Sequence, residues 1–345
     1  MRTDQQLQDE KFMQRALQLA GLGRGSVSPN PMVGCVIVHG DMIIGEGWHR
    51  KYGGPHAEVN AIAEVANKDL LQQSTVYVSL EPCSHFGKTP PCADLLIKYR
   101  VRRVVVANVD PNPIVAGNGI ARLRAAGIDV TEGIFRAEGR DLNRRFFVFM
   151  EQKRPYIILK WAQTSDGFIA RENFDSKWIS NAYSRMLVHR WRSEEDGIMV
   201  GTRTALQDDP QLNVRDWSGR NPVRIVVDRS LKLPANLKVF DGSSTTICYN
   251  LKKNQMSSGV EFVKLPIENF IEEMLKDLYQ RKIQSLIVEG GTQLLHAFLD
   301  ARCWDEARVF YSSAMFGKGI AAPKMDGKPV QHQSIGGDTL RIYQP

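Results

Sequence analysis

The residues that constrain this chain most are His56, Glu58, Cys83 and Cys92. One histidine nitrogen and two cysteine sulfurs form a zinc ligand set that leaves the fourth tetrahedral position open for water. Glu58 lies two residues after His56 and stays free to transfer protons. These side chains can meet only if the chain between them returns to one point. The pattern therefore predicts a folded domain built around a catalytic metal centre.

The sequence around these residues predicts regular structure. Apolar spacing after Pro55 indicates a helix over residues 57–65, so His56 and Glu58 lie at its start. Residues 74–80 read as a strand, with Cys83 just beyond it, and residues 92–98 as a second helix. Both sulfurs are expected near helix N-termini, where the helix dipole favours thiolates and so metal binding.

The spacing of the two cysteines differs from that of most zinc deaminases. Zinc deaminases usually have two residues between these cysteines, whereas this chain has eight, residues 84–91. Bound zinc lowers the pKa of water to about 7, and Glu58 can carry the proton to a ring nitrogen and help an amine leave as ammonia. His85 could be a competing ligand or a wall of the pocket, and His49 is interpreted as the end of a strand. A metal-free alternative is a redox pair formed by Cys83 and Cys92.

Length and composition set outer limits. A chain of 345 residues exceeds what one hydrophobic core usually supports, so two domains are expected. Five cysteines are too few and too scattered for a disulfide framework, and no apolar run is long enough to cross a bilayer. We therefore expect a cytoplasmic protein with no membrane partner. The net charge of +7 is spread along the chain and suits an anionic small substrate as well as nucleic acid.

Alternation of strands and helices organises the first half. Helices are expected over residues 8–22 and 118–126, and strands over residues 32–38, 42–48, 103–108 and 128–131. This order implies a three-layer α/β sandwich. Asn30 lies between two prolines and is held extended, so its amide could point into a cleft or simply serve a turn. The polar segment at residues 152–155 suggests a boundary between domains 1–150 and 151–345.

The second half begins with an apolar strand at residues 156–161 and has no Gly-x-Gly-x-x-Gly fingerprint. A different phosphate cradle is possible. Residues 285–288 read as a buried strand, residues 289–292 as a glycine turn, and residues 293–299 as a helix. Backbone amides at that helix start could hold a pyrophosphate, although a Gly-Gly turn can equally serve packing.

Several runs of sequence together resemble the bifunctional deaminase-reductases of riboflavin biosynthesis. They are PNPMVG at 29–34, HAE at 56–58, EPCSHFGKTPPC at 81–92, DPNP at 110–113, KWAQTSDG at 160–167, WIS at 178–180, DDPQL at 208–212 and VEGG at 288–291. The resemblance covers nearly the whole chain. It implies a cytidine-deaminase-like α/β/α domain with one zinc ion, followed by a dihydrofolate-reductase-like α/β domain that uses NADPH.

The resemblance also implies site residues. For the phosphorylated pyrimidine of the first step these are Asn30, His85, Lys88 and Thr89, and for that of the second step Ser176, Arg192, Leu212, Arg215 and Glu289. For NADPH they are Ala162, Trp178, Thr204, Asp208, Gly291, Thr292, Gln293, Leu294, Leu295, His296 and Ala297. Lys160 and Glu289 are the candidates for proton transfer in the reduction, with Asp208 as a third.

One position departs from the family pattern, because Arg229 follows Asp228 where related sequences have a serine. A serine contact to the cofactor is therefore in doubt, and Arg229 could instead meet its 2′-phosphate. Family resemblance also suggests a homodimer or homotetramer. Two other readings stay open: a nucleoside or transfer-RNA base deaminase fused to a binding domain, and a zinc-stabilised RNA-binding module without catalysis. Both require a basic, aromatic face, which the sequence does not indicate.

Overall fold

The computed structural model describes residues 2–85, 90–113 and 116–345. The chain divides into two compact units, Met1–Lys153 and Arg154–Pro345. The expected boundary after residue 150 falls inside helix α6 (Arg144–Gln152), whose Phe146 and Phe147 pack against Leu80 of the first unit. The allocation of the two activities to residues 1–150 and 151–345 stays a prediction. Within the described residues, no helix is long and apolar enough to cross a membrane.

The first unit contains a five-stranded sheet in the order β2-β1-β3-β4-β5. Its strands are β1 (Gly34–His39), β2 (Met42–Trp48), β3 (Thr75–Leu80), β4 (Arg103–Asn108) and β5 (Asp129–Glu132). Strand β1 runs antiparallel to β2 and β3, whereas β3, β4 and β5 are parallel. In a parallel sheet the chain leaves neighbouring strands at the same edge, so the segments after β3 and β4 lie close together.

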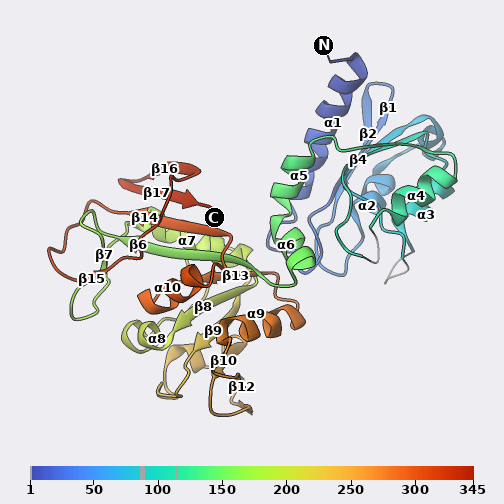
Figure 1. Ribbon diagram of the computed structural model, residues 1–345. Helices are drawn as coiled ribbons and strands as arrows, with labels where there is room; N and C mark the ends of the chain where they lie inside the picture. The colour runs from blue at the N-terminus through green and yellow to red at the C-terminus, as the bar shows by residue number, and fades with distance from the viewer. Residues whose placement is uncertain (1, 86–89, 114–115) are drawn as a thin grey trace. The chain divides into compact units, whose positions relative to one another are not determined.

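Helices cover both faces of this sheet (Figure 1). On one face, α1 (Asp4–Gly21) packs through Phe12 and Met13 onto Val36 and Tyr77, next to α5 (Arg136–Leu142). The other face is covered by α2 (Ala57–Glu64), α3 (Cys92–Lys98) and α4 (Asn118–Ala125). Successive β1 residues alternate between the two clusters, as strand geometry requires. The expected three-layer sandwich is confirmed.

The second unit is built on a ten-stranded sheet in the order β11-β12-β10-β9-β8-β13-β6-β14-β17-β16. Its strands are β6 (Tyr156–Gln163), β8 (Gly197–Gly201), β9 (Val223–Val227), β10 (Thr246–Asn250), β11 (Gln255–Ser257), β12 (Val260–Lys264), β13 (Ser285–Val288), β14 (Glu306–Tyr311), β16 (Gln331–Ile335) and β17 (Asp338–Tyr343). A separate pair joins β7 (Phe168–Ala170) to β15 (Ile320–Ala321). The central strands from β12 to β14 are mutually parallel.

Helices pack on both faces of this second sheet. The largest core cluster contains side chains of α9 (Phe270–Gln280) and α10 (Thr292–Asp300). On the opposite face, Trp191 of α7 (Ala182–Glu194) stacks on Phe310 of β14. Strand β13, the glycine turn and α10 follow each other as the sequence predicts. The helices α6, α7 and α8 (Thr202–Asp208) were not predicted.

Candidate active sites

The structure brings His56, Cys83 and Cys92 together in the first unit. Their possible ligand atoms all lie within 4.8 Å of one another. The Nδ1 atom of His56 is 3.5 Å from the sulfur of Cys83 and 3.4 Å from that of Cys92. Among the described residues, these three side chains form the one group of possible metal ligands. One nitrogen and two sulfurs at this spacing fit a zinc ion with one open position.

Local structure accounts for the convergence. His56 is the N-cap residue of α2, Cys92 is the first residue of α3, and Cys83 lies in the turn that leaves β3. A backbone hydrogen bond of 3.1 Å from Ala93 to the Cys83 carbonyl ties this turn to α3. The backbone N–H of Cys92 also donates to the sulfur of Cys83 at 3.3 Å. The ligands therefore sit on helix starts and on a turn that α3 holds.

The surroundings move the pKa values of the Cys83 and Cys92 thiols in opposite directions. Hydrogen bonds from Cys92 and His56 lower the pKa of Cys83 to about 4, whereas the bond to Cys83 and burial raise the pKa of Cys92. Both thiols are free rather than joined in a disulfide. Two sulfurs this close together lose both protons only when a positive charge lies between them, and a zinc dication is such a charge. The chemistry of the donor set therefore fits the metal.

Glu58 lies in the first turn of α2 and is buried, with 3% of its surface exposed. Burial raises the pKa of its carboxyl group, and the nearby Cys83 raises it further. A carboxyl group whose pKa is raised holds a proton more readily than a free carboxyl group does. This is the environment expected for the proton carrier.

The buried His49, which the sequence predicts only as the end of a strand, lies beside this group. His49 Nδ1 is 3.0 Å from the Pro55 carbonyl, and Nε2 is 3.1 Å from the side-chain nitrogen of Asn30. Because the carbonyl can only accept, Nδ1 carries the proton and Nε2 accepts from Asn30. His49 thereby fixes the orientation of the Asn30 amide, one of the expected substrate ligands. No spacing rule in the sequence signals this contact.

The structure describes only part of the loop between the two cysteines. His85 is exposed and lies outside the ligand group, so nothing in the geometry makes it a metal ligand. Lys88 and Thr89, which were expected to bind the first substrate, lie outside the described residues. Their roles stay predictions.

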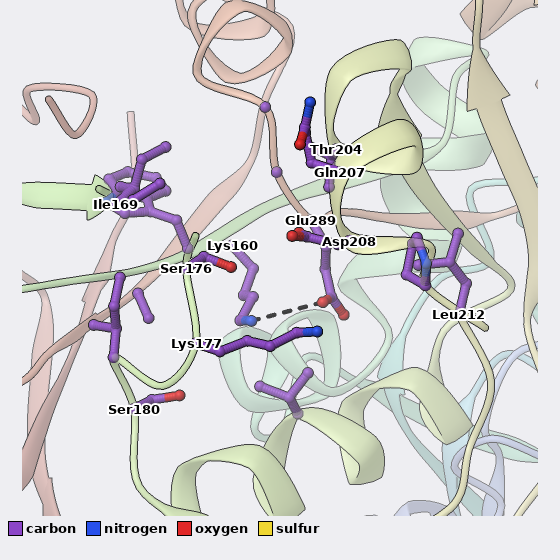
Figure 2. A pocket seen from close by; sticks show the side chains of 18 of the residues that line it. Lys160, Ile169, Ser176, Lys177, Ser180, Thr204, Gln207, Asp208, Leu212 and Glu289 are labelled. Carbon is purple, nitrogen blue, oxygen red and sulfur yellow. Dashed lines mark ion pairs between the residues drawn. The ribbon is translucent and has the colours of Figure 1, made fainter. Parts of the chain in front are cut away.

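The second unit contains a pocket of about 530 Å³ (Figure 2). It collects residues from distant parts of the sequence, because β6, α7, α8 and the turn after β13 all border it. The expected site residues that line it are Lys160, Ala162, Ser176, Trp178, Arg192, Thr204, Asp208, Leu212, Arg215, Glu289, Gly291, Thr292 and Gln293. A pocket of this size suits a small organic ligand.

Three charged side chains meet at one wall of the pocket. Arg192 Nε and Nη2 each donate to a Glu289 oxygen at 2.8 Å, and Lys160 Nζ lies 3.6 Å from Glu289 Oε2 (Figure 2). Burial by itself would raise the pKa of Glu289, but the charges of Arg192 and Lys160 outweigh it and hold this pKa at about 2. Burial lowers the pKa of Lys160, with Glu289 opposing that effect. Glu289 is therefore a fixed anion, and Lys160 is the group whose proton is easier to remove.

The guanidinium of Arg192 is already paired inside the pocket and is not open to a phosphate. This group faces Glu289 and also donates to the Asn213 carbonyl at 3.2 Å. Arg215 is more exposed and donates to the side chains of Asn213 and Gln211 at 2.7 and 3.4 Å. Of the two arginines, Arg215 keeps the freer access to an anionic ligand.

The side of the pocket expected to hold the cofactor includes the glycine turn. Gly290 and Gly291 have positive φ and lie against Thr204 of α8, so a larger residue there would be strained. Asp208 also lines the pocket, and burial raises its pKa. Further along α10, Leu294, Leu295, His296 and Ala297 are not among the lining residues, and Leu295 is fully buried in the core. Arg229 is outside the lining as well, with its guanidinium 5.1 Å from the Phe270 ring.

The sequence reading missed His189, which lines the same pocket from α7. The backbone N–H of Arg215 points to its Nδ1 at 3.3 Å, and its Nε2 is 3.3 Å from Asp216 Oδ2. Burial lowers the pKa of His189, and the charges of Arg192 and Arg215 lower it further. His189 and Arg192 are three residues apart, which places them on one face of a helix. This spacing could have indicated His189 only if the sequence had predicted α7.

Comparisons with known proteins found a matching family for each half of the chain. Residues 6–108 match the cytidine and deoxycytidylate deaminase zinc-binding region, and residues 155–341 match the RibD C-terminal domain. A riboflavin biosynthesis protein RibD from Aquifex aeolicus is 42% identical over 320 residues, covering 91% of this chain and 89% of its own. The RibD protein of Actinobacillus pleuropneumoniae is 38% identical over 334 residues, covering 94% and 88%.

Solved structures agree over the full length. A diaminohydroxyphosphoribosylaminopyrimidine deaminase/5-amino-6-(5-phosphoribosylamino)uracil reductase from Thermotoga maritima has a TM-score of 0.91 and 38% identity, covering 99% of both chains. RibD of Acinetobacter baumannii has a TM-score of 0.90 and 34% identity, covering 99% of this chain and 100% of its own.

Fold and sites thus define a zinc-binding pyrimidine-type deaminase domain joined to a reductase domain in one chain. The chain belongs to the RibD family. It is a bifunctional enzyme of riboflavin biosynthesis, with deaminase and reductase activities. The family resemblance found in the sequence, the bifunctional function and the two fold classes are confirmed.

Proposed function

We propose that the first unit deaminates 2,5-diamino-6-(5-phosphoribosylamino)pyrimidin-4(3H)-one and that the second reduces the ribosyl group of 5-amino-6-(5-phosphoribosylamino)uracil to ribityl. The observation that carries the first step is the convergence of His56, Cys83 and Cys92 beside the buried Glu58. The named relative from Thermotoga maritima supports this choice of substrates.

In the deamination, His56, Cys83 and Cys92 would hold one zinc ion per chain, which would act as a Lewis acid toward water at neutral pH. Glu58 is the group that would take a proton from the attacking water, pass a proton to the ring nitrogen and assist the departure of ammonia. Asn30, fixed by His49, binds the pyrimidine, and His85, Lys88 and Thr89 bind the base or its phosphorylated ribose.

In the reduction, bound NADPH would supply the hydride for C1′ of the opened imine form, and a side chain of the pocket must supply the proton for the imine nitrogen. Of Lys160 and Glu289, Lys160 is the better proton donor, because its pKa is lowered by burial whereas Glu289 is held ionised. Glu289 then serves as the counter-ion of Lys160. Ser176, Leu212 and Arg215 bind the substrate, and Arg192 acts through Glu289.

NADPH binding is assigned to the other wall of the pocket. Ala162, Trp178, Thr204 and Asp208 line it together with Gly291, Thr292 and Gln293 at the start of α10. Backbone amides at this helix start suit a pyrophosphate, and the exposed face of Trp178 suits a planar ring. Leu294, Leu295, His296 and Ala297 lie further along α10 and do not line the pocket, so they are not among the proposed cofactor contacts. A homo-oligomer, a cytoplasmic location and the absence of nucleic-acid and membrane partners stay predictions.

Product analysis tests this proposal. Purified protein is incubated with the diaminopyrimidine substrate, with and without NADPH. We expect zinc-dependent ammonia release in both cases and oxidation of NADPH only after deamination. Ammonia release without any NADPH oxidation by the deaminated product would contradict the reductase half.

A further inference from the structure

The turn that carries Cys83 is preceded by Glu81, a carboxylate with 4% of its surface exposed. Glu81 contributes no ligand to the metal group and has no part in the chemistry described above. Its backbone N–H donates to the Asn108 carbonyl at the end of β4 at 2.9 Å, which keeps it at the edge where β3 and β4 end.

Four backbone N–H groups donate to the Glu81 carboxylate. Its Oε2 accepts from Asp110 at 3.1 Å and from Gly117 at 2.9 Å, and its Oε1 accepts from Gly119 at 2.9 Å and from Ile120 at 3.2 Å. Gly119 and Ile120 belong to the first turn of α4, whose N-cap residue is Gly117. Since a glycine has no side chain to cap its own helix, Glu81 provides the cap from a distant part of the sequence.

The same helix start also touches the ligand turn directly. A Cβ atom added to Gly119 would lie 2.0 Å from the Pro82 carbonyl oxygen, which is closer than any real contact. The first turn of α4 is therefore packed against the backbone of the residue that precedes Cys83. Glu81 and Gly119 together fasten residues 81–83 to the start of α4.

We propose that Glu81 is a positioning residue for the metal site: its carboxylate joins the turn bearing Cys83 to Asp110 and to the start of α4, and so holds the Cys83 sulfur in place. This inference rests on the assignment of His56, Cys83 and Cys92 as zinc ligands. Holding a ligand in place before the metal arrives raises metal affinity, because less conformational freedom is lost on binding.

The substitution Glu81→Gln tests the role of the carboxylate. An amide has one accepting oxygen and an NH₂ group that would face two N–H donors, so one pair of hydrogen bonds is lost. We expect zinc affinity, measured by competition with a coloured chelator, to fall about tenfold or more, in the range known for outer ligand partners. The absorption of the cobalt-substituted protein should change as well, while reductase activity in the same chain stays unchanged.

A matched control separates positioning from general loss of stability. Asp9 is another buried carboxylate of the same unit, on the face of the sheet covered by α1, where Arg103 donates to both of its oxygens at 2.8 Å. Asp9→Asn should lower the melting temperature of the first unit and leave zinc affinity and the cobalt spectrum at their wild-type values. Wild-type zinc affinity in Glu81→Gln, or an equal loss of affinity in Asp9→Asn, would overturn the proposal.

The wild-type protein offers a second measurement if Glu81→Gln does not fold. Coupling between the metal and α4 is reciprocal, so removal of zinc should speed amide hydrogen exchange at Gly117, Gly119 and Ile120. Exchange around Asp9 should not change. Unchanged exchange at the α4 start would reject the inference. A wild-type protein that binds no zinc at all would instead contradict the proposed function.

Discussion

Glu58 and Glu289 are both buried carboxylates, yet their surroundings move their pKa values in opposite directions. For Glu58, burial and the neighbouring Cys83 raise the pKa. For Glu289, the charges of Arg192 and Lys160 overcome burial and hold the pKa at about 2. The surroundings of Glu58 therefore favour the protonated carboxyl group, whereas those of Glu289 favour the anion.

Replacing Glu58 by Gln should keep the metal site and remove the proton carrier. We expect ammonia release to fall by about 10²- to 10⁴-fold, the usual contribution of a general acid-base group. Zinc content, measured by atomic absorption, should stay at the wild-type level. Glu64→Gln, at an exposed position of the same helix, is the control and should retain activity. Loss of zinc from Glu58→Gln would argue against a purely catalytic role.

Replacing Glu289 by Gln should disable the reductase. Arg192 and Lys160 would then keep their charges in a buried site without their shared counter-ion. Removing one partner of a buried ion pair lowers the free energy of unfolding by about 3–5 kcal/mol. We expect slower NADPH oxidation and a lower unfolding midpoint of the second unit, with ammonia release unchanged. Glu272→Gln, exposed on α9, should change neither quantity. An unaltered reductase rate would remove Glu289 from the proposed site.

At the scale of elements, α7 determines the geometry of the second pocket. It presents Arg192 to Glu289 and His189 to the segment that carries Arg215 and Asp216. With Nδ1 of His189 accepting from the Arg215 backbone, the neutral ring must carry its proton on Nε2, toward Asp216. Protonation of Nδ1 would remove that acceptor and release the Arg215 segment.

This arrangement makes the stability of the second unit depend on pH. The folded-state pKa of His189 lies below its unfolded value of about 6.5, so between these two values the unfolded chain binds more protons. The contribution of neutral His189 to the free energy of unfolding is fully present above about pH 6.5 and is lost as the pH falls through the window between the two pKa values. Urea unfolding of the second unit, followed by tryptophan fluorescence, should show this decline. His189→Asn keeps a hydrogen-bond acceptor that does not titrate, so it should make this decline of stability with falling pH shallower. An equally steep decline in the variant would show that other groups cause the pH dependence.

At the scale of the whole molecule, the two groups of candidate site residues lie in different compact units of the chain. The metal ligands all belong to Met1–Lys153, and the pocket residues all belong to Arg154–Pro345. Each unit has its own sheet and its own core. The second activity therefore has no direct need of the metal.

Removal of zinc should separate the two activities. After treatment with a strong chelator, we expect ammonia release to disappear and the first unit to melt at a lower temperature, because metal binding stabilises the folded state. NADPH oxidation with supplied deaminated product should continue at the original rate. Added zinc should restore deamination. A parallel loss of both activities would show that the reductase depends on the metal site.

The sequence by itself determined the two fold classes, and it predicted the metal ligands, Glu58 and the two-domain plan. Ligand types, their positions beside expected elements and the alternation of strands and helices are all local properties of the chain. The same reasoning predicted β13, the glycine turn and α10, because apolar periodicity and glycines mark such units directly.

Only the tertiary structure decided how distant residues share a partner. The four donors to Glu81, the pairing of Arg192 with Glu289, and the contacts of His49 and His189 join residues far apart in sequence. The same holds for the exclusion of Leu295 from the pocket, since burial depends on what packs against α10. Local pattern specifies which elements form, whereas charge pairing and burial depend on which elements meet.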